Sequence, residues 1–256
     1  MLFSSIVYGP IRSRRLGVSL GVNLMPTDAK LCTFDCVYCE CGWNRPVSHA
    51  QLPTREQVRE AIATTLSSFA SGDDNGIDVI TFSGNGEPTL HPDFLGIIQD
   101  TCALRDQYYP NAKISVLSNS TRLVNPSVVQ ALLLCDNRIL KLDSAITSTM
   151  RLIDKPVNPD LTVEHLIDRL LQFNGDFTLQ TCFLTGDYNG QIIDNTTDEE
   201  LEAWYQVVER LHPKQVMIYV IDRATPLQTL AKVPASKMEQ IAAPLRDKGI
   251  DVIVSA

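Results

Sequence analysis

Short apolar segments alternate with amphipathic, helix-like segments along almost the whole chain, and this alternation restricts the fold more than any other feature of the sequence. Strands are predicted at residues 16–24, 77–83, 113–118, 139–143, 177–184, 215–221 and 250–254. Alternating strands and helices are typical of a parallel sheet with right-handed crossovers. These segments form six βα units, against eight in a complete barrel. We therefore predict an α/β fold built as a partial (βα)6 barrel, with a doubly wound open sheet as the alternative.

The helical segments between these strands begin at recognisable N-terminal signals. A hydroxyl residue followed three positions later by Glu or Gln predicts a capping box, in which two backbone amides at the helix start are satisfied reciprocally. Three pairs have this spacing: Thr54 with Gln57, Thr197 with Glu200, and Ser236 with Glu239. Because no internal repeat, low-complexity tract or long linker interrupts the pattern, residues 1–256 are expected to form one domain.

The composition is that of an ordinary globular protein, with 44% hydrophobic and 20% charged residues. The longest notable apolar run covers residues 216–221, whereas a membrane-spanning helix needs roughly 20 residues. No basic stretch followed by a long apolar stretch marks a secretory signal. A cytoplasmic protein without a membrane partner is therefore expected. The net charge of −8 gives no global attraction to phosphate backbones.

Four of the seven cysteines, Cys32, Cys36, Cys39 and Cys41, lie within ten residues. An odd, clustered set differs from the disulfide framework of a small secreted protein and indicates a metal site. The spacing C-x3-C-x2-C places three thiolates on one short loop, where each can bind one iron of a cubic [4Fe–4S] cluster and leave the fourth iron open. The alternative is a tetrahedral zinc site with Cys41 as fourth ligand, although structural zinc usually takes two separated pairs of ligands.

With Tyr38 as the aromatic residue before the last cysteine, residues 32–39 resemble the hallmark motif of the radical S-adenosylmethionine (radical SAM) superfamily. The resemblance implies a partial barrel of the radical SAM type, catalytic and metal-binding roles for Cys32, Cys36 and Cys39, and two cofactors, a [4Fe–4S] cluster and S-adenosylmethionine. In that family the reduced cluster cleaves S-adenosylmethionine to methionine and a 5′-deoxyadenosyl radical, which removes a hydrogen atom from the substrate. An enzyme of the oxidoreductase or lyase type is expected, with an electron donor such as flavodoxin or ferredoxin.

A Gly-rich turn follows the second predicted strand directly, at Gly84, Asn85, Gly86 and Glu87. It resembles the Gly-Gly-Glu-Pro segment with which the family binds the methionine ammonium, except that Asn85 replaces the first glycine of the strict motif. The resemblance implies that the glycines let the backbone approach S-adenosylmethionine closely and that Glu87 contributes a carboxylate.

Further polar side chains stand at the ends of the third and fourth predicted strands. Ser118 and Asn119 match positions where the family places polar groups near the ribose and the methionine carboxylate. The carboxyl ends of parallel strands open onto one face, so Asp143 and Tyr38 are also expected beside S-adenosylmethionine. For Asp143 and its neighbour Lys141, a buried ion pair is the alternative.

Longer stretches of the chain resemble the branch of the superfamily that contains the wyosine tRNA-modifying enzymes. These stretches are residues 9–17, 21–26, 153–156, 194–197 and 219–226. Wyosine synthases hold a second cluster with N-terminal cysteines, and no cysteine precedes Cys32 here, which argues against wyosine synthesis itself. The resemblance to this branch still implies a tRNA base as the first substrate to consider. The alternatives are an activating enzyme that generates a glycyl radical on a partner protein, and a non-catalytic iron–sulfur or zinc protein.

Five basic residues bracket the cysteine loop in an otherwise acidic chain: Arg12, Arg14, Arg15, Lys30 and Arg45. The planar guanidinium of arginine suits phosphate and carboxylate groups, so this segment is expected to recognise an anionic substrate, either tRNA or an acidic small molecule. The alternative is a solvated, charge-balancing surface on which an arginine pairs with an acid such as Glu40.

Overall fold

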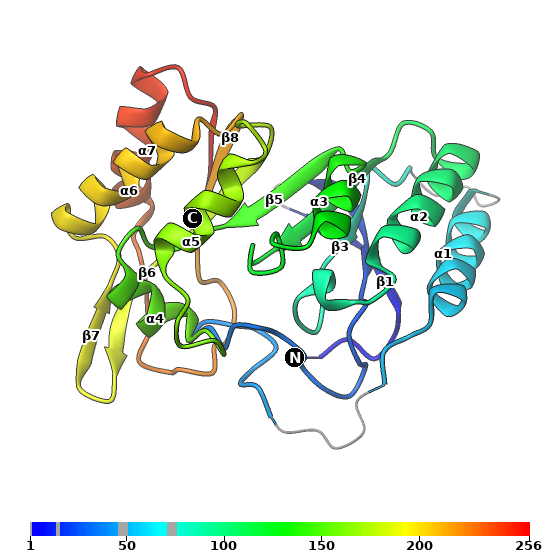
Figure 1. Cartoon of the computed structure of the whole chain (residues 1–256), viewed down its shortest axis with the longest axis horizontal. Helices are drawn as coiled ribbons and strands as arrows, with labels where there is room; N and C mark the ends of the chain where they lie inside the picture. The colour runs from blue at the N-terminus through cyan, green and yellow to red at the C-terminus, as the bar shows by residue number, and fades with distance from the viewer. Residues whose placement is uncertain (1, 14–15, 46–50, 71–75) are drawn as a thin grey trace. The chain divides into compact units, whose positions relative to one another are not determined.

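The computed structural model describes residues 2–13, 16–45, 51–70 and 76–256, which fall into two compact units (Figure 1). Unit 1 comprises Met1–Cys32, Asn44–Ser118 and Arg122–Arg138. Unit 2 comprises Thr33–Trp43, Asn119–Thr121 and Ile139–Ala256. The boundary therefore falls inside the cysteine motif, directly after Cys32. The expectation of a single domain over residues 1–256 stays a prediction.

Unit 1 contains a four-stranded, mainly parallel sheet in the order β1–β2–β3–β4. Strand β1 (Val7–Ser13) runs antiparallel to β2 (Gly17–Val22), and β3 (Val79–Phe82) and β4 (Lys113–Ser118) follow in parallel. All four residues of β3 are buried, which is typical of a parallel strand covered on both faces. The three helices of the unit lie side by side in Figure 1: α1 (Arg55–Ala70), α2 (Phe94–Tyr108) and α3 (Pro126–Leu133). A short 3-10 turn, η1 (Pro88–Leu90), follows β3.

Unit 2 contains parallel strands in the order β5–β6–β8–β10. Its strands are β5 (Asn137–Lys141), β6 (Thr178–Tyr188), β8 (Gln215–Val220) and β10 (Val252–Ser255). Two short strands, β7 (Gln191–Asp194) and β9 (Ala231–Lys232), pair antiparallel with the last part of β6. The helices of the unit are α4 (Thr147–Asp154), α5 (Val163–Leu171), α6 (Asp198–Leu211) and α7 (Ala235–Asp247).

The predicted α/β class is confirmed, because all seven predicted strands form and all of them belong to parallel ladders. Over the described ranges, neither unit closes its sheet into a ring. The sequence did not predict β1, β7 or β9. Strand β1 contains Gly9 and Pro10, which indicate a turn, and the other two are very short. Within the same ranges, no helix combines the length and apolarity needed to span a bilayer.

The three predicted capping boxes have three different outcomes. Thr54 and Gln57 form the full reciprocal pair, at 2.8 and 3.2 Å. Thr197 accepts from the amide of Glu200, but the Glu200 carboxylate accepts from Ser144 instead of returning to the cap. The prediction of a capping box at Ser236 is wrong, because α7 already begins at Ala235 and its N-cap is Pro234. Proline fits there because its ring fixes φ near the −61° that this N-cap position has.

Candidate functional site

The cysteine loop is fixed in unit 2 through its backbone. The amides of Asp35 and Val37 donate to the carbonyls of Asp154 and Ile153, each at 2.9 Å. The acceptors lie at the end of α4, inside the stretch 153–156 that resembles the wyosine branch. Each bond satisfies a carbonyl that a helix end leaves without an intrahelical partner. The helix end and the cysteine loop therefore stabilise each other.

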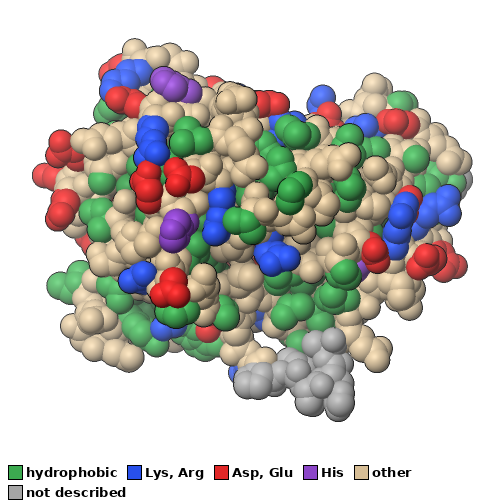
Figure 2. All heavy atoms as spheres, in the orientation of Figure 1, with side chains coloured by type: hydrophobic (Ala, Val, Ile, Leu, Met, Phe, Trp, Pro, Cys, Tyr) green, Lys and Arg blue, Asp and Glu red, His purple; other side chains and the backbone are tan. Residues whose placement is uncertain are grey.

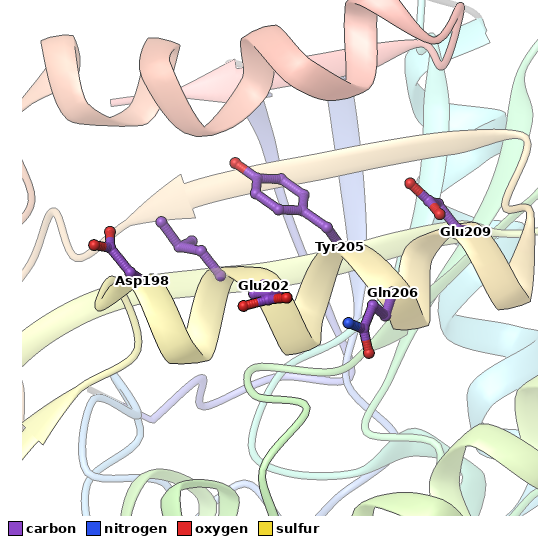
Figure 3. A pocket seen from close by; sticks show the side chains of 6 residues that line it. Asp198, Glu202, Tyr205, Gln206 and Glu209 are labelled. Carbon is purple, nitrogen blue, oxygen red and sulfur yellow. The ribbon is translucent and has the colours of Figure 1, made fainter.

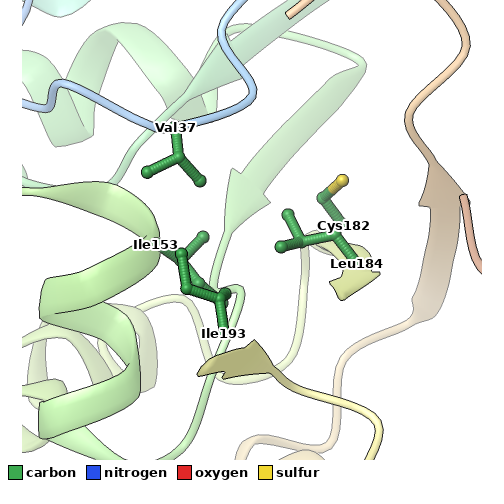
Figure 4. Packing of buried hydrophobic residues seen from close by; sticks show 5 residues of the cluster. All are labelled: Val37, Ile153, Cys182, Leu184 and Ile193. Carbon is green, nitrogen blue, oxygen red and sulfur yellow. The ribbon is translucent and has the colours of Figure 1, made fainter. Parts of the chain in front are cut away.

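A small apolar cluster includes Val37 and so packs one residue of the loop into the core of unit 2. Its buried members are Val37 from the loop, Ile153 from α4, Cys182 and Leu184 from β6, and Ile193 from β7 (Figure 4). All five side chains are fully buried. Cys182 thus acts as a small core residue.

The cysteines of the motif differ in exposure. Cys36 is buried, whereas Cys32, Cys39 and Cys41 are half-buried. A turn follows Cys36, closed by a bond from the amide of Cys39 to the carbonyl of Cys36 at 3.1 Å. The amide of Gly42 in turn donates to the carbonyl of Cys39 at 2.9 Å. The loop is therefore compact where the last two cysteines of the motif lie.

Tyr38 and Asp143, both predicted beside S-adenosylmethionine, are joined directly. The Tyr38 hydroxyl donates to Asp143 Oδ2 at 2.5 Å, and Tyr219 donates to the Tyr38 oxygen at 3.4 Å. Burial raises the pKa of Tyr38 well above its ordinary value, and the negative charge of Asp143 adds to the effect. Tyr38 therefore stays a neutral donor that fixes the Asp143 carboxylate.

An ion pair between Lys141 and Asp143, which was the alternative interpretation of these two residues, is present at 2.9 Å. Asp154 of α4 forms a second ion pair with the same lysine. The side chains of both acids are almost completely buried. Burial disfavours the charged lysine, but the two carboxylates outweigh that effect and raise its pKa above the ordinary value. Burial also raises the pKa of Asp154 to about 7, against the opposing effect of Lys141. The sequence analysis did not identify Asp154 as a site residue, although Asp154 belongs to the stretch 153–156 that resembles the wyosine branch.

Asn195 holds this network to the sheet of unit 2. Its amide group donates to the carbonyls of Asp143 and Cys182 at 2.7 and 2.8 Å, and its oxygen accepts from the amide of Leu184 at 2.9 Å. Asn195 belongs to the stretch 194–197 and Tyr219 to the stretch 219–226, both of which resemble the wyosine branch. Two of these stretches, 153–156 and 219–226, thus bond to the cysteine loop, and Asn195 is linked to it through Asp143.

In unit 1, the Gly-rich turn pairs with the residue immediately before Cys32. The amide of Leu31 donates to the carbonyl of Asn85 at 2.9 Å, and the amide of Glu87 donates to the carbonyl of Leu31 at 3.0 Å. Gly86, between them, has φ +143°, and a Cβ there would lie 1.8 Å from the Leu31 oxygen. This close approach explains why a glycine is required in the turn.

The Glu87 side chain is buried in a hydrogen-bond network. Its Oε1 accepts from the amide and hydroxyl of Thr89, at 3.1 and 2.5 Å, and from Ser118 at 2.9 Å. The carboxylate thus caps η1 and brings together two of the predicted S-adenosylmethionine contacts, Glu87 and Ser118. Asn85 instead binds the backbone of Phe3 and Pro26 through its side chain, so its amide group has a structural role here.

Asn119 bonds to the part of the cysteine loop that belongs to unit 2. Its amide donates to the Thr33 hydroxyl at 2.8 Å, and its oxygen accepts from the Thr121 hydroxyl at 2.7 Å. The two threonine hydroxyls share a further hydrogen bond at 2.6 Å. Asn119 thus contacts the residue that directly follows Cys32.

The basic residues do not form the predicted surface as a set. Arg12 and Arg45 are exposed, but Lys30 is only 7% exposed, so its inclusion in an exposed basic surface was wrong. Arg14 and Arg15 lie outside the described residues. Glu40 pairs with Arg223, at 2.6 Å. Acidic and basic side chains are interspersed on the face drawn in Figure 2.

Residues 29–173 match the model of the radical SAM superfamily. The chain belongs to this superfamily. The matched segment includes the cysteine motif, the Gly-rich turn and the Lys141–Asp143 pair. Radical SAM enzymes use a [4Fe–4S] cluster and S-adenosylmethionine.

Several curated proteins are similar in sequence to this chain over most of its length. A UPF0026 protein of Helicobacter pylori (strain 26695) is 34% identical over 223 residues, which are 85% of this chain and 67% of the relative. A UPF0026 protein of Synechocystis is 31% identical over 231 residues, 87% of this chain and 77% of the relative. The GTPase Obg of Brachyspira hyodysenteriae is 28% identical over 238 residues, 91% of this chain. The chain spans only 32% of that last protein.

Solved radical SAM structures share the fold. TYW1 with a bound lysine-pyruvate adduct has a TM-score of 0.63 at 14% identity, over 90% of this chain and 73% of TYW1. Streptococcus suis SuiB bound to S-adenosylmethionine also has a TM-score of 0.63 at 14% identity, over 89% of this chain and 49% of SuiB. The predicted fold of the radical SAM type is thereby confirmed.

The donor set of the radical SAM loop fits a [4Fe–4S] cluster in kind and number. Three cysteines lie within eight residues, and no disulfide joins any of the seven cysteines, all of which the structure describes. Among the described residues, no three His, Cys, Asp or Glu side chains gather closely enough to hold a metal ion as they stand.

A shallow pocket lies along α6. It is lined by Asp198, Leu201, Glu202, Tyr205, Gln206 and Glu209 (Figure 3). None of the predicted cluster or S-adenosylmethionine residues lines this pocket.

Proposed function

We propose that this radical SAM enzyme holds its [4Fe–4S] cluster with Cys32, Cys36 and Cys39, which leaves one iron for S-adenosylmethionine. The observation that carries the proposal is the C-x3-C-x2-C loop, anchored through Asp35 and Val37 to the end of α4. When bound and reduced, the cluster supplies the electron that cleaves S-adenosylmethionine to a 5′-deoxyadenosyl radical. An electron donor such as flavodoxin or ferredoxin and a cytoplasmic location complete the proposal.

The residues of the chain are proposed to bind and orient the cofactors. The Gly-rich turn presents backbone groups to the methionine part of S-adenosylmethionine, while Glu87 and Ser118 offer polar groups already fixed by each other. Asn119 holds the start of the cysteine loop through Thr33. The Tyr38–Asp143 bond keeps the aromatic residue of the motif in place beside the last cysteine.

Anaerobic reconstitution tests the ligand assignment. Wild-type protein is expected to bind about four irons and to form 5′-deoxyadenosine when reduced. Alanine at Cys32, Cys36 or Cys39 should abolish this cleavage, while Cys41→Ala in the same loop should largely keep it. Cys102→Ala, on α2, controls for the loss of a thiol. If Cys41→Ala loses the cluster as completely as the other loop variants, the three-ligand assignment is wrong.

The role of Glu87 requires a conservative change, because the carboxylate also caps η1. Glu87→Gln keeps an oxygen acceptor for Thr89 and Ser118 but removes the charge that would attract an ammonium. S-adenosylmethionine affinity is expected to fall while cluster absorbance is unchanged, and Glu60→Gln, an exposed change on α1, should alter neither. Calorimetry that finds equal affinities for wild type and Glu87→Gln would remove Glu87 from the binding site.

We further propose that the substrate is a tRNA base. The resemblance to the wyosine branch supports this class, since two of the stretches that carry it, 153–156 and 219–226, bond to the cysteine loop. Binding to bulk tRNA should then weaken steeply with salt. Glu substitutions at the exposed residues Arg12 and Arg45 should lower the salt slope by about one unit for each phosphate that the protein no longer neutralises. Lys214→Glu is the control, because that exposed lysine pairs with Asp176.

Absence of salt-dependent tRNA binding at low ionic strength would contradict the tRNA proposal. A partner protein or an acidic small molecule would then be the better substrate class. The ligand assignment for the cluster would be unaffected, because reconstitution and S-adenosylmethionine cleavage need no substrate.

A further inference from the structure

Lys141 is a buried cation that points at one of the proposed cluster ligands. Its ammonium lies 3.5 Å from Cys36 Sγ and 2.9 Å from Asp143 Oδ2, and it forms a second ion pair with Asp154. The ring of Phe34 covers it, 4.9 Å from the nitrogen to the ring centroid. The side chain is only 12% exposed. The sulfur of Cys36 therefore shares its surroundings with a fixed positive charge.

The two carboxylates explain why a charged lysine is stable in this place. A lysine buried without partners would lose its proton to avoid the cost of desolvation. Here Asp143 is itself fixed by Tyr38 and by the amide of Cys182, while the backbone of Asp154 is bonded to the cysteine loop. The acids thus hold the ammonium in one position, and the loop that carries Cys36 is tied to the same helix end as Asp154.

We propose that Lys141 is a positioning residue for the cluster, whose ammonium donates to Cys36 Sγ and favours the reduced state. The inference rests on the proposed ligation of iron by Cys36. Reduction adds a negative charge to a cluster that thiolates already make anionic, and hydrogen bonds and charges around the ligand sulfurs set the reduction potential. A cation at Cys36 lowers the energy of the reduced form more than that of the oxidised form. Asp154, 3.5 Å from the same sulfur, has the opposite effect and limits the shift.

Two substitutions with opposite charge effects test the proposal. Lys141→Met removes the cation at nearly constant length and should make one-electron reduction at least tenfold less favourable, a shift of about 59 mV to more negative potential. Asp154→Asn removes a negative charge near the same sulfur and should shift the potential to less negative values. The measurement is an EPR-monitored redox titration of reconstituted protein without S-adenosylmethionine, with all variants in the same buffer.

Two further variants separate charge from structure. Lys141→Arg keeps the cation and should restore most of the wild-type potential. Lys155→Met removes the cation that directly follows Asp154 in the chain. That ammonium contacts the Tyr188 hydroxyl at 3.2 Å instead of Cys36, so the shift should be well under tenfold. The proposal is overturned if Lys141→Met and Asp154→Asn shift the reduction potential in the same direction. It is also overturned if the shift for Lys141→Met is no larger than the shift for Lys155→Met.

The proposal can still be tested if the Lys141→Met variant binds no iron. If Lys141→Met fails to retain a cluster, Asp154→Asn decides: a less negative potential supports the proposal, and an unchanged or more negative one overturns it. If wild-type protein itself binds no cluster, the proposed ligation by the cysteines is refuted instead.

Discussion

Replacing Gly86 by alanine should strongly destabilise the Gly-rich turn. The residue has φ +143°, where an L side chain costs about 1–3 kcal/mol, and its new Cβ would lie 1.8 Å from the carbonyl oxygen of Leu31. That oxygen is backbone and cannot rotate away, so the bonds of Leu31 to Asn85 and Glu87 must break or stretch. Each bond contributes roughly 0.5–1.5 kcal/mol. The expected total is about 4 kcal/mol, a large part of the roughly 5–15 kcal/mol by which a typical domain is stable.

Two glycines elsewhere in the chain supply graded controls for this experiment. Gly249 has φ +80°, but a Cβ added there would have no atom within 4 Å, so Gly249→Ala should lose only the conformational part, about 1–2 kcal/mol. Gly76 has neither a positive φ nor a neighbour within 4 Å of an added Cβ, and its replacement should cause no loss.

Urea unfolding of the apo-protein, followed by far-ultraviolet circular dichroism, measures all three variants under one condition. The unfolding midpoint should fall furthest for Gly86→Ala, less for Gly249→Ala and not at all for Gly76→Ala. If Gly86→Ala and Gly249→Ala have the same midpoint, the close approach to Leu31 contributes nothing and the reasoning fails.

Three further outcomes follow from buried or paired polar groups. Asn195→Ala should lower the free energy of unfolding by about 2–4 kcal/mol in urea titrations, because three backbone groups lose their partner; an unchanged midpoint would contradict its structural role. Tyr38→Phe should lower the thermal midpoint, since it removes the donor to the buried Asp143 carboxylate, and an equal midpoint would show that the bond is weak. The hydrogen bond from Arg55 lowers the pKa of Asp100, so Asp100→Asn should be less stable than wild type near neutral pH. That difference should shrink as pH falls through the folded-state pKa, and a difference that persists in acid would refute the linkage.

Local features of the sequence were sufficient to predict the parallel strands and the loop that carries the cysteines. Strand periodicity is a property of a few consecutive residues, and all seven predicted strands form. The spacing of Cys32, Cys36 and Cys39 and the superfamily resemblance likewise depend on short segments. The predictions failed where a neighbour decided the outcome: Pro234 displaced the cap expected at Ser236, and Lys30 became buried.

Only the tertiary structure showed which distant residues meet around the cysteine loop. Cys36 and Asp154 are separated by 118 positions, and Cys36 and Lys141 by 105, yet each pair lies 3.5 Å apart. No local pattern encodes such contacts, because they arise when the end of α4 bonds to the loop and both pack on the apolar cluster of unit 2. The sequence therefore determined which groups are available for chemistry. Packing determined that a buried cation, held by two carboxylates, lies against one of the three thiols.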